Sequence, residues 1–358
     1  MQWRAAWIEW RNRRLASPRF HDWALATPIV RRIARKRAQA LFDLVAGFAY
    51  AQVLAAAVRL DLPGVLAEGA QDSEAIAARI GLAHEPARVL LRAAAALGLA
   101  ERLRDGRYIL GPQGAALRGT PGVAAMIAHH DRLYQDLADP VALLARGGGG
   151  GQLAAFWRYG AGGDAAAVEG YSRLMAASQP LVAQQILDAW DFGRHRALLD
   201  LGGGDGAFLE SVAERHPALD LTLVDLPAVA DRARRRLGAR ARVIAGDFRS
   251  DPLPEGADLV TLVRILHDHD DLPAQALLRR IARLLPPGGT LLIAEPLADT
   301  PGAEAMGAYF GMYLLAMGSG RPRRADEIGA MLAEAGFTHW RRIPTRHPLT
   351  LGLIAATR

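Results

Sequence analysis

The sequence predicts an α/β protein, in which a mainly α-helical region precedes a C-terminal domain with a seven-stranded, mostly parallel sheet. Two observations support this fold class. After Trp190, short apolar runs alternate with amphipathic runs, which is the pattern of a doubly wound parallel sheet. The last two apolar runs have no helix between them and therefore predict an antiparallel hairpin that closes one edge of the sheet: GFTHWRRI and HPLTLGLIAATR.

Length and composition exclude several classes of protein. With 358 residues, the chain has room for about two domains. It is 51% hydrophobic and 22% charged, as in a folded globular protein. It has no cysteine, which excludes disulfides, thiolate metal sites and cysteine nucleophiles. No apolar run approaches the ~20 residues of a membrane span and the N-terminus lacks the pattern of a signal peptide, so we expect a cytoplasmic protein.

The first predicted region is a basic arm, residues 1–37. It holds ten Arg or Lys residues against two acidic residues, whereas the rest of the chain holds 33 basic residues against 35 acidic ones. Three tryptophans recur in it at helical spacing: Trp3, Trp7 and Trp10. Tryptophan beside arginine on a short helix suits a surface of anionic lipid. The alternative is that the indoles pack on the body of the protein or on a partner subunit.

The second predicted region, residues 38–190, is mainly helical. The run from Ala38 to Leu60 is apolar on most sides and predicts a buried helix. A helix capped by Asp72 or Ser73, a second helix and a short hairpin then follow, which is the winged-helix pattern. The second helix is rich in alanine and leucine, so we expect packing or dimerisation and no binding to nucleic acid.

The third predicted region, residues 191–358, carries the sheet. Its strands and helices are expected in this order: RALLDLG, AFLESVAERH, LDLTLVDL, AVADRARRRL, ARVIAGD, ADLVTLVRIL, LPAQALLRRIARLL and GTLLIAEPL. A helix over 304–317 and the closing hairpin complete the domain. We expect an acceptor pocket lined by this helix and by helices that precede the sheet.

A glycine-rich run, 202–206, lies where the first strand turns into a helix. Glycines there let a ligand lie against bare backbone. Asp225 closes the second strand 19 residues after Gly206, where an acid accepts hydrogen bonds from ribose hydroxyls. The glycines alone fit NAD and S-adenosylmethionine equally well.

Three further features favour S-adenosylmethionine. Asp200, at the end of the first strand, suits a ligand that carries ammonium and sulfonium cations and is a poor neighbour for a pyrophosphate. Asp247 and Phe248 follow the third strand and offer a carboxylate for the adenine amino group and an aromatic ring for its face. The closing hairpin is the third feature.

The sequence resembles the class I S-adenosylmethionine-dependent methyltransferases, and more narrowly the small-molecule O-methyltransferases that join a winged-helix dimerisation domain to a Rossmann-like domain. The resemblance runs from about Ala38 to the end and rests on motifs in family order: LDLGGGDG, VDLP, GDF, RILHDHDD, LLIAEP and AEAGF. Residues 256–323 and FDLVAGF most resemble the demethylspheroidene O-methyltransferases of purple phototrophic bacteria, which methylate the tertiary hydroxyl of acyclic carotenoids.

The resemblance implies a homodimer, S-adenosylmethionine as cofactor, a lipophilic alcohol as acceptor and no metal. It also implies that His267 is the general base and that Glu295 orients it. Cofactor contacts are expected from Asp200, Gly202, Gly204, Asp225, Leu226, Asp247, Phe248 and Arg264. Acceptor contacts are expected from Met175, Asp268, Tyr309, Met312 and Tyr313. A carotenoid acceptor lies in the membrane. We therefore expect the arm to make peripheral contact with the inner face of a photosynthetic membrane.

The sequence departs from the family at one position. Plant members carry a second glutamate shortly before the last helix, and alignment on AEAGF places Ala325 there. Asp326 and Glu327 are offset by one and two residues. Other functions weighed against carotenoid methylation are methylation of a phenol or polyketide, a winged-helix DNA-binding regulator and an NAD-dependent oxidoreductase.

Overall fold

The computed structural model describes residues 2–160, 179–348 and 351–358. The chain forms two compact units, Met1–Gly119 and Thr120–Arg358. These units differ from the regions expected from sequence, 38–190 and 191–358, because helices before residue 160 pack against a helix that follows the fifth strand of the main sheet. Each unit is described by itself.

The first unit begins with three helices, of which the second and third start at prolines, a favoured residue at the first helical position. The elements in order are α1 Gln2–Leu15, α2 Pro18–Ala26, α3 Pro28–Arg59, α4 Leu62–Ala67, α5 Ser73–Arg79, α6 His84–Ala96, β1 Ala100–Arg102, β2 Tyr108–Leu110 and α7 Pro112–Arg118. Asp72 caps α5 by accepting a 2.8 Å hydrogen bond from the Ala75 amide. The winged-helix pattern of α5, α6 and the antiparallel β1–β2 hairpin is therefore confirmed.

The expectation of a buried helix over 38–60 was wrong for the single chain. Leu44 is 81% exposed and Phe48 is 76% exposed, and Leu41, Phe42 and Val45 are exposed as well. The reason is length: α3 has 32 residues and spans about 48 Å, more than its shorter neighbours α4 and α6 can cover. By length and composition alone α3 could cross a membrane, which also corrects the expectation that no apolar run is that long.

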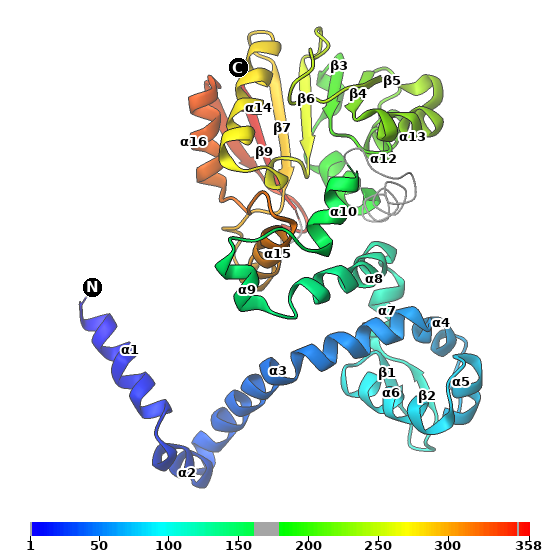
Figure 1. Ribbon diagram of the computed structural model, residues 1–358, viewed down its shortest axis with the longest axis vertical. Coiled ribbons are helices and arrows are strands. Elements are labelled where there is room, and N and C mark those ends of the chain that lie inside the picture. The colour runs from blue at the N-terminus through cyan, green and yellow to red at the C-terminus, as the bar shows by residue number, and fades with distance from the viewer. Residues whose placement is uncertain (1, 161–178, 349–350) are drawn as a thin grey trace. The chain divides into compact units, whose positions relative to one another are not determined.

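The second unit contains the sheet and further helices (Figure 1). The helices are α8 Pro121–Asp136, α9 Pro140–Ala145, α10 Gln152–Gly160, the helical residues 179–189, α12 Ala207–Arg215, α13 Pro227–Leu237, α14 Asp271–Leu284, α15 Glu304–Met317 and α16 Ala325–Ala335. The strands are β3 Ala197–Leu201, β4 Asp220–Asp225, β5 Arg242–Ala245, β6 Leu259–Val263, β7 Thr290–Glu295, β8 His339–Ile343 and β9 Gly352–Thr357.

The seven strands lie in the order β5-β4-β3-β6-β7-β9-β8. Of the seven described strands, β9 alone runs opposite to the others and pairs antiparallel with β7 and β8, so the predicted closing hairpin is confirmed. Alternate strand residues point to opposite faces: Leu198 packs with α12 and α13, and Leu199 packs with α14 and α16. Helices therefore cover both faces of the sheet, as Figure 1 shows.

The strand order reverses at β3, which lies between β4 and β6. From β3 the chain proceeds outward through β4 and β5, and then returns to β6 on the other side. At such a reversal the connections after the strands diverge and leave a crevice at their carboxyl ends. The loop after β3 and the turn after β6 meet there.

Candidate active site

The glycine loop after β3 forms one wall of a cleft of about 340 Å³. Gly202 and Gly204 have φ angles of 71° and 62°, a left-handed conformation that side chains disfavour. A Cβ atom at Gly202 would collide with Ile265, whereas no atom lies within 4 Å of one at Gly204. Backbone atoms are therefore exposed to the cleft, whose volume suits a small molecule.

Asp225, at the end of β4, ties this loop to the neighbouring strand. Its carboxylate accepts hydrogen bonds from the amides of Gly204, at 2.8 Å, and Leu226, at 2.7 Å. Burial raises the pKa of Asp225 to about 6, although these two bonds oppose the rise. The carboxylate lines the cleft beside the glycines, where the sequence placed a ribose-binding acid.

Most of the residues expected to hold the cofactor line this cleft. They are Gly202, Gly204, Asp225, Leu226, Asp247, Phe248 and Arg264. Asp247 forms a two-pronged ion pair with Arg249, at 2.7 Å between Nη2 and Oδ2, which lowers the pKa of Asp247. Arg249 and His269 also line the cleft, and the sequence analysis missed both, although they lie in the GDFR and LHDH runs.

Asp200 lies beneath the loop and is not part of the cleft wall, so its expected contact with a cation of the ligand stays a prediction. Its side chain is fully buried, and Thr261 donates a 2.6 Å hydrogen bond to one of its oxygens. Within the described part of the chain, the other oxygen has no hydrogen-bond partner. Burial raises the pKa of Asp200 to about 7. A Cβ at Gly203 would meet this carboxyl, so Asp200 fixes the loop from below.

His267 lies in a short 3-10 turn after β6, Leu266–Asp268, and contacts two carboxylates. Its Nδ1 contacts Oε2 of Glu295, which ends β7 and is only 2% exposed. Its Nε2 lies 3.1 Å from Oδ1 of Asp268. Burial alone would lower the pKa of His267, but the two carboxylates outweigh it and raise that pKa well above its usual range.

Glu295 also positions the backbone of the turn. Its Oε1 accepts hydrogen bonds from the amides of Leu266, at 2.6 Å, and Ile265, at 3.1 Å. One carboxylate therefore holds the imidazole ring and the peptide bonds before it. Asp268, whose carboxylate contacts Nε2, lines the cleft, whereas His267 does not.

Two of the acceptor residues expected on α15, Tyr309 and Tyr313, form hydrogen bonds with other helices. Trp157 is only a donor and gives its Nε1 proton to the Tyr313 hydroxyl at 3.2 Å. The same hydroxyl lies 2.9 Å from Nε2 of His129. Burial lowers the pKa of His129 to about 4, so its imidazole is neutral. Tyr309 contacts Nε2 of His130 at 2.7 Å in the same way.

The cleft wall on this side consists of residues that the sequence analysis missed, Trp157, Met317 and Ser319. Tyr309, Met312 and Tyr313 do not line it. Tyr313 is connected to the cleft wall by its hydrogen bond with Trp157. A tryptophan in a helix gives no signal of its own in the sequence. Met175 lies outside the described residues.

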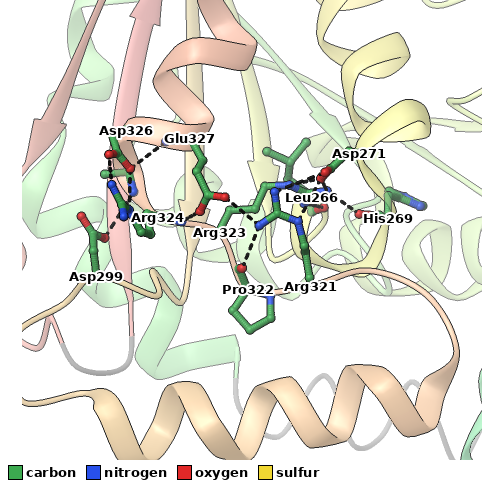
Figure 2. A network of polar contacts seen from close by, with 11 residues as sticks. Leu266, His269, Asp271, Asp299, Arg321, Pro322, Arg323, Arg324, Asp326 and Glu327 are labelled. Carbon is green, nitrogen blue, oxygen red and sulfur yellow. Dashed lines mark hydrogen bonds and ion pairs between the residues drawn. The ribbon is translucent and has the colours of Figure 1, made fainter. Parts of the chain in front are cut away.

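Neither candidate for the second family glutamate contacts His267. Asp326 pairs with Arg324, and Glu327 accepts a 2.8 Å hydrogen bond from the Arg324 amide (Figure 2). Ala325 is buried, at 6% exposed, and its amide donates to Asp299. Both acids therefore stabilise the start of α16, and in this structure the second carboxylate beside the imidazole is Asp268.

The chain matches two known domains. An O-methyltransferase domain matches residues 134–338, and an O-methyltransferase dimerisation domain matches residues 42–118.

Three similar proteins illustrate the match. The chain is 44% identical to the demethylspheroidene O-methyltransferase of Cereibacter sphaeroides over 96% of this chain and 93% of that protein. It is 43% identical to the demethylspheroidene O-methyltransferase of Rhodobacter capsulatus over 96% of this chain and 88% of that protein. A solved structure of a methyltransferase of calicheamicin biosynthesis, in its SAH-bound form, has 27% identity and a TM-score of 0.75, with 90% of this chain and 98% of that chain covered.

We predict that Asp268→Asn lowers the pKa of His267. The substitution removes a negative charge 3.1 Å from Nε2, and a nearby anion favours the imidazolium form. The measurement is an NMR pH titration of the His267 ring carbon, assigned by its loss in His267→Ala. Asp270→Asn is the matched control, because this carboxylate accepts a hydrogen bond from Gly320 instead. An unchanged titration in Asp268→Asn would contradict the geometry of the pair.

Proposed function

The chain belongs to the O-methyltransferase family, and we propose that it transfers the methyl group of S-adenosylmethionine to the tertiary hydroxyl of an acyclic hydroxycarotenoid. The observation that carries this proposal is the His267 imidazole, held by Glu295 next to a cleft with a glycine-rich wall. The acceptor is inferred from the two demethylspheroidene O-methyltransferases, which match nearly the whole chain.

The residues of the cleft fit S-adenosylmethionine. Asp225 offers a carboxylate where ribose hydroxyls bind, and Leu226 and Phe248 offer apolar surface for adenine. Asp247 offers a carboxylate for the adenine amino group once Arg249 turns aside. S-adenosylmethionine supplies a methyl group on a positively charged sulfur, which an oxygen nucleophile attacks. The reaction asks the protein to hold that oxygen near the methyl group and to accept its proton.

We propose that His267 accepts this proton. Two carboxylates hold its imidazole in the protonated form in the ligand-free protein. If the acceptor hydroxyl takes the place of Asp268 at Nε2, one of these anions leaves the ring. The pKa of His267 then falls, Nε2 releases its proton to water, and the neutral ring, which Glu295 keeps oriented, can accept the proton of the hydroxyl. Asp268, at the cleft wall, is well placed to bind the hydroxyl as it enters.

The acceptor side of the cleft is apolar, which supports a lipophilic alcohol. Trp157, Ile265 and Met317 line it. The hydrogen bonds from Trp157 to Tyr313 and onward to His129 orient the indole, so its flat face is fixed before the acceptor binds. Apolar surface binds the polyene chain because burial removes that chain from water. The position of the buried chain then fixes where its single hydroxyl lies.

A homodimer is supported by the dimerisation domain at 42–118. This range contains the exposed apolar residues of α3, including Phe42 and Phe48. We propose that a second copy of the chain covers them, because a single soluble chain rarely leaves such a patch open.

The direct test incubates the protein with S-adenosylmethionine and 1-hydroxylated acyclic carotenoids in detergent micelles. Mass spectrometry should show a gain of one methyl group on the tertiary hydroxyl. His267→Ala should lower kcat by about a hundredfold or more, because general base catalysis contributes about 10²- to 10⁴-fold. Binding of S-adenosylmethionine, followed by calorimetry, should stay near the wild-type value in this variant.

Asp225→Ala is the matched control at the donor end of the cleft. It should weaken binding of S-adenosylmethionine, because it removes the ribose acceptor and a support of the glycine loop. Transfer of methyl groups to a phenol or polyketide but to no carotenoid would contradict the proposed acceptor. Wild-type kcat in His267→Ala would contradict the proposed base.

We further propose that the N-terminal arm attaches the enzyme to anionic membranes, where a carotenoid resides. On α1, Trp3 is 78% exposed, and Trp7 and Trp10 are more than half exposed. Arg11 lies over the Trp7 ring at 5.2 Å from its centroid, and Arg14 lies over Trp10 at 5.7 Å. Indole at headgroup depth beside guanidinium favours reversible, salt-sensitive binding at the membrane surface.

In a full-length variant with Trp3, Trp7 and Trp10 changed to alanine, sedimentation with anionic vesicles should weaken more than about tenfold, because burying each indole contributes on the order of 1 kcal/mol or more. Binding of S-adenosylmethionine should not change, and neutral vesicles serve as the control. Equal sedimentation of the variant and the wild type would instead support packing of the indoles on protein.

A further inference from the structure

Arg323 is a buried arginine that lies outside the cleft. Its side chain is only 2% exposed, in the segment between α15 and α16. Buried arginines are rare, because taking a guanidinium out of water costs free energy unless its donors are all used. The hydrogen-bond partners of Arg323 therefore indicate its role.

The guanidinium binds the turn that carries His267 (Figure 2). Its Nη1 donates a 2.8 Å hydrogen bond to the carbonyl of Leu266, and its Nη2 donates a 2.7 Å hydrogen bond to the carbonyl of His269. Its Nε and Nη2 also donate to Oδ1 of Asp271, at 3.1 and 2.8 Å. These two carbonyls lie immediately before and after the His267–Asp268 pair.

Arg323 and Glu295 hold opposite kinds of backbone group in this turn. Glu295 accepts from the amides of Ile265 and Leu266, whereas Arg323 donates to the carbonyls of Leu266 and His269. Leu266 is thus fixed at its amide and at its carbonyl. The turn cannot rotate about this residue without breaking a buried, charge-assisted hydrogen bond on one side.

The rest of the segment after α15 contacts the same turn. The Ser319 hydroxyl donates a 3.0 Å hydrogen bond to the carbonyl of Asp268, and the Gly320 amide donates to Asp270 at 2.9 Å. A Cβ at Gly320 would collide with the carbonyl of His267. Since Ser319 also lines the cleft, this segment connects the acceptor wall to the base.

We propose that Arg323 is a positioning residue for His267. Arg323 holds the turn so that the imidazole stays in contact with Glu295. This role rests on the proposed function, in which His267 is the base. An arginine suits it because the planar fork reaches two carbonyls and a carboxylate at once, which the single ammonium of lysine does not. Arg323 touches neither the described cleft nor the groups that bind cofactor, so its effect on the reaction passes through the ring.

The charged and titratable groups around His267 come from three elements. Glu295 comes from β7, Asp268 and His269 come from the turn itself, and Arg323 comes from the segment before α16. If the turn loosens, the ring moves away from Glu295 first, because that carboxylate is fixed in the sheet. The imidazolium form then loses its main anion.

The test compares Arg323→Gln, Arg323→Lys and the control Arg321→Gln in the full-length enzyme. Arg321 binds the same Asp271, at 3.1 Å, but reaches no carbonyl of the turn. In Arg323→Gln, kcat should fall by about tenfold to a hundredfold, because a small displacement of a catalytic group lowers the rate by about that much. The KM for S-adenosylmethionine should stay within about twofold of the wild-type value. Arg323→Lys, which keeps the buried charge, should lose less.

The readout specific to positioning is the NMR titration of His267 in the ligand-free protein. It should move to lower pH in Arg323→Gln and Arg323→Lys and stay in place in Arg321→Gln. An unchanged titration and unchanged kcat in folded Arg323 variants would overturn the proposal, as would equal losses in Arg321→Gln. If Arg323→Gln does not fold, Arg323→Lys carries the test. Because the titration needs no substrate, it is separate from the proposed function, which fails only if wild-type enzyme methylates no carotenoid.

Discussion

The shared carboxylate of Glu295 is the interaction on which the candidate site depends. Parallel pairing of β6 with β7 sets Val263 opposite Ala294, so Arg264, which follows β6, lies beside Glu295, the last residue of β7. The Arg264 amide donates to the Ala294 carbonyl at 2.8 Å, and Arg264 then adopts a φ of 59°, which turns the chain across the end of β7. Glu295 meets this turn with one oxygen on the backbone amides and the other on the imidazole. The fold therefore orients the His267 imidazole by means of the sheet.

The electrostatics of the site follow from this arrangement. The buried carboxylate of Glu295 needs a positive partner, and His267 supplies it when protonated. Asp268 adds a second anion on the cleft side. The imidazole is thus stabilised as a cation. Asp225 and the glycine loop form one wall of the cleft, and Asp268, which contacts the imidazole, lines the same cleft after a different strand.

The parts of the site that could be predicted from sequence are those fixed by strand ends. The glycine loop, Asp247 and His267 follow strands, Asp225 and Glu295 end strands, and parallel strands bring their carboxyl ends to one edge. Contacts from remote segments gave no such signal: Arg323 and Trp157 lie far along the chain from the turn and the cleft that they support. The exposure of α3 could not be predicted, because an apolar pattern indicates that a helix face is covered but does not identify the surface that covers it. The burial of Asp200 below the loop follows from its position in the strand, which its charge alone does not indicate.

The most direct test of this account measures the Glu295→Gln enzyme. Glutamine keeps the shape and can still accept from the Leu266 amide, but it removes the charge that orients and stabilises the imidazolium. The account predicts that kcat for methyl transfer falls by about a hundredfold or more, because the base is no longer oriented, with S-adenosylmethionine binding unchanged and the His267 titration moved to lower pH. Wild-type kcat together with an unchanged titration would contradict it, because the shared carboxylate would then govern neither the ring nor the reaction.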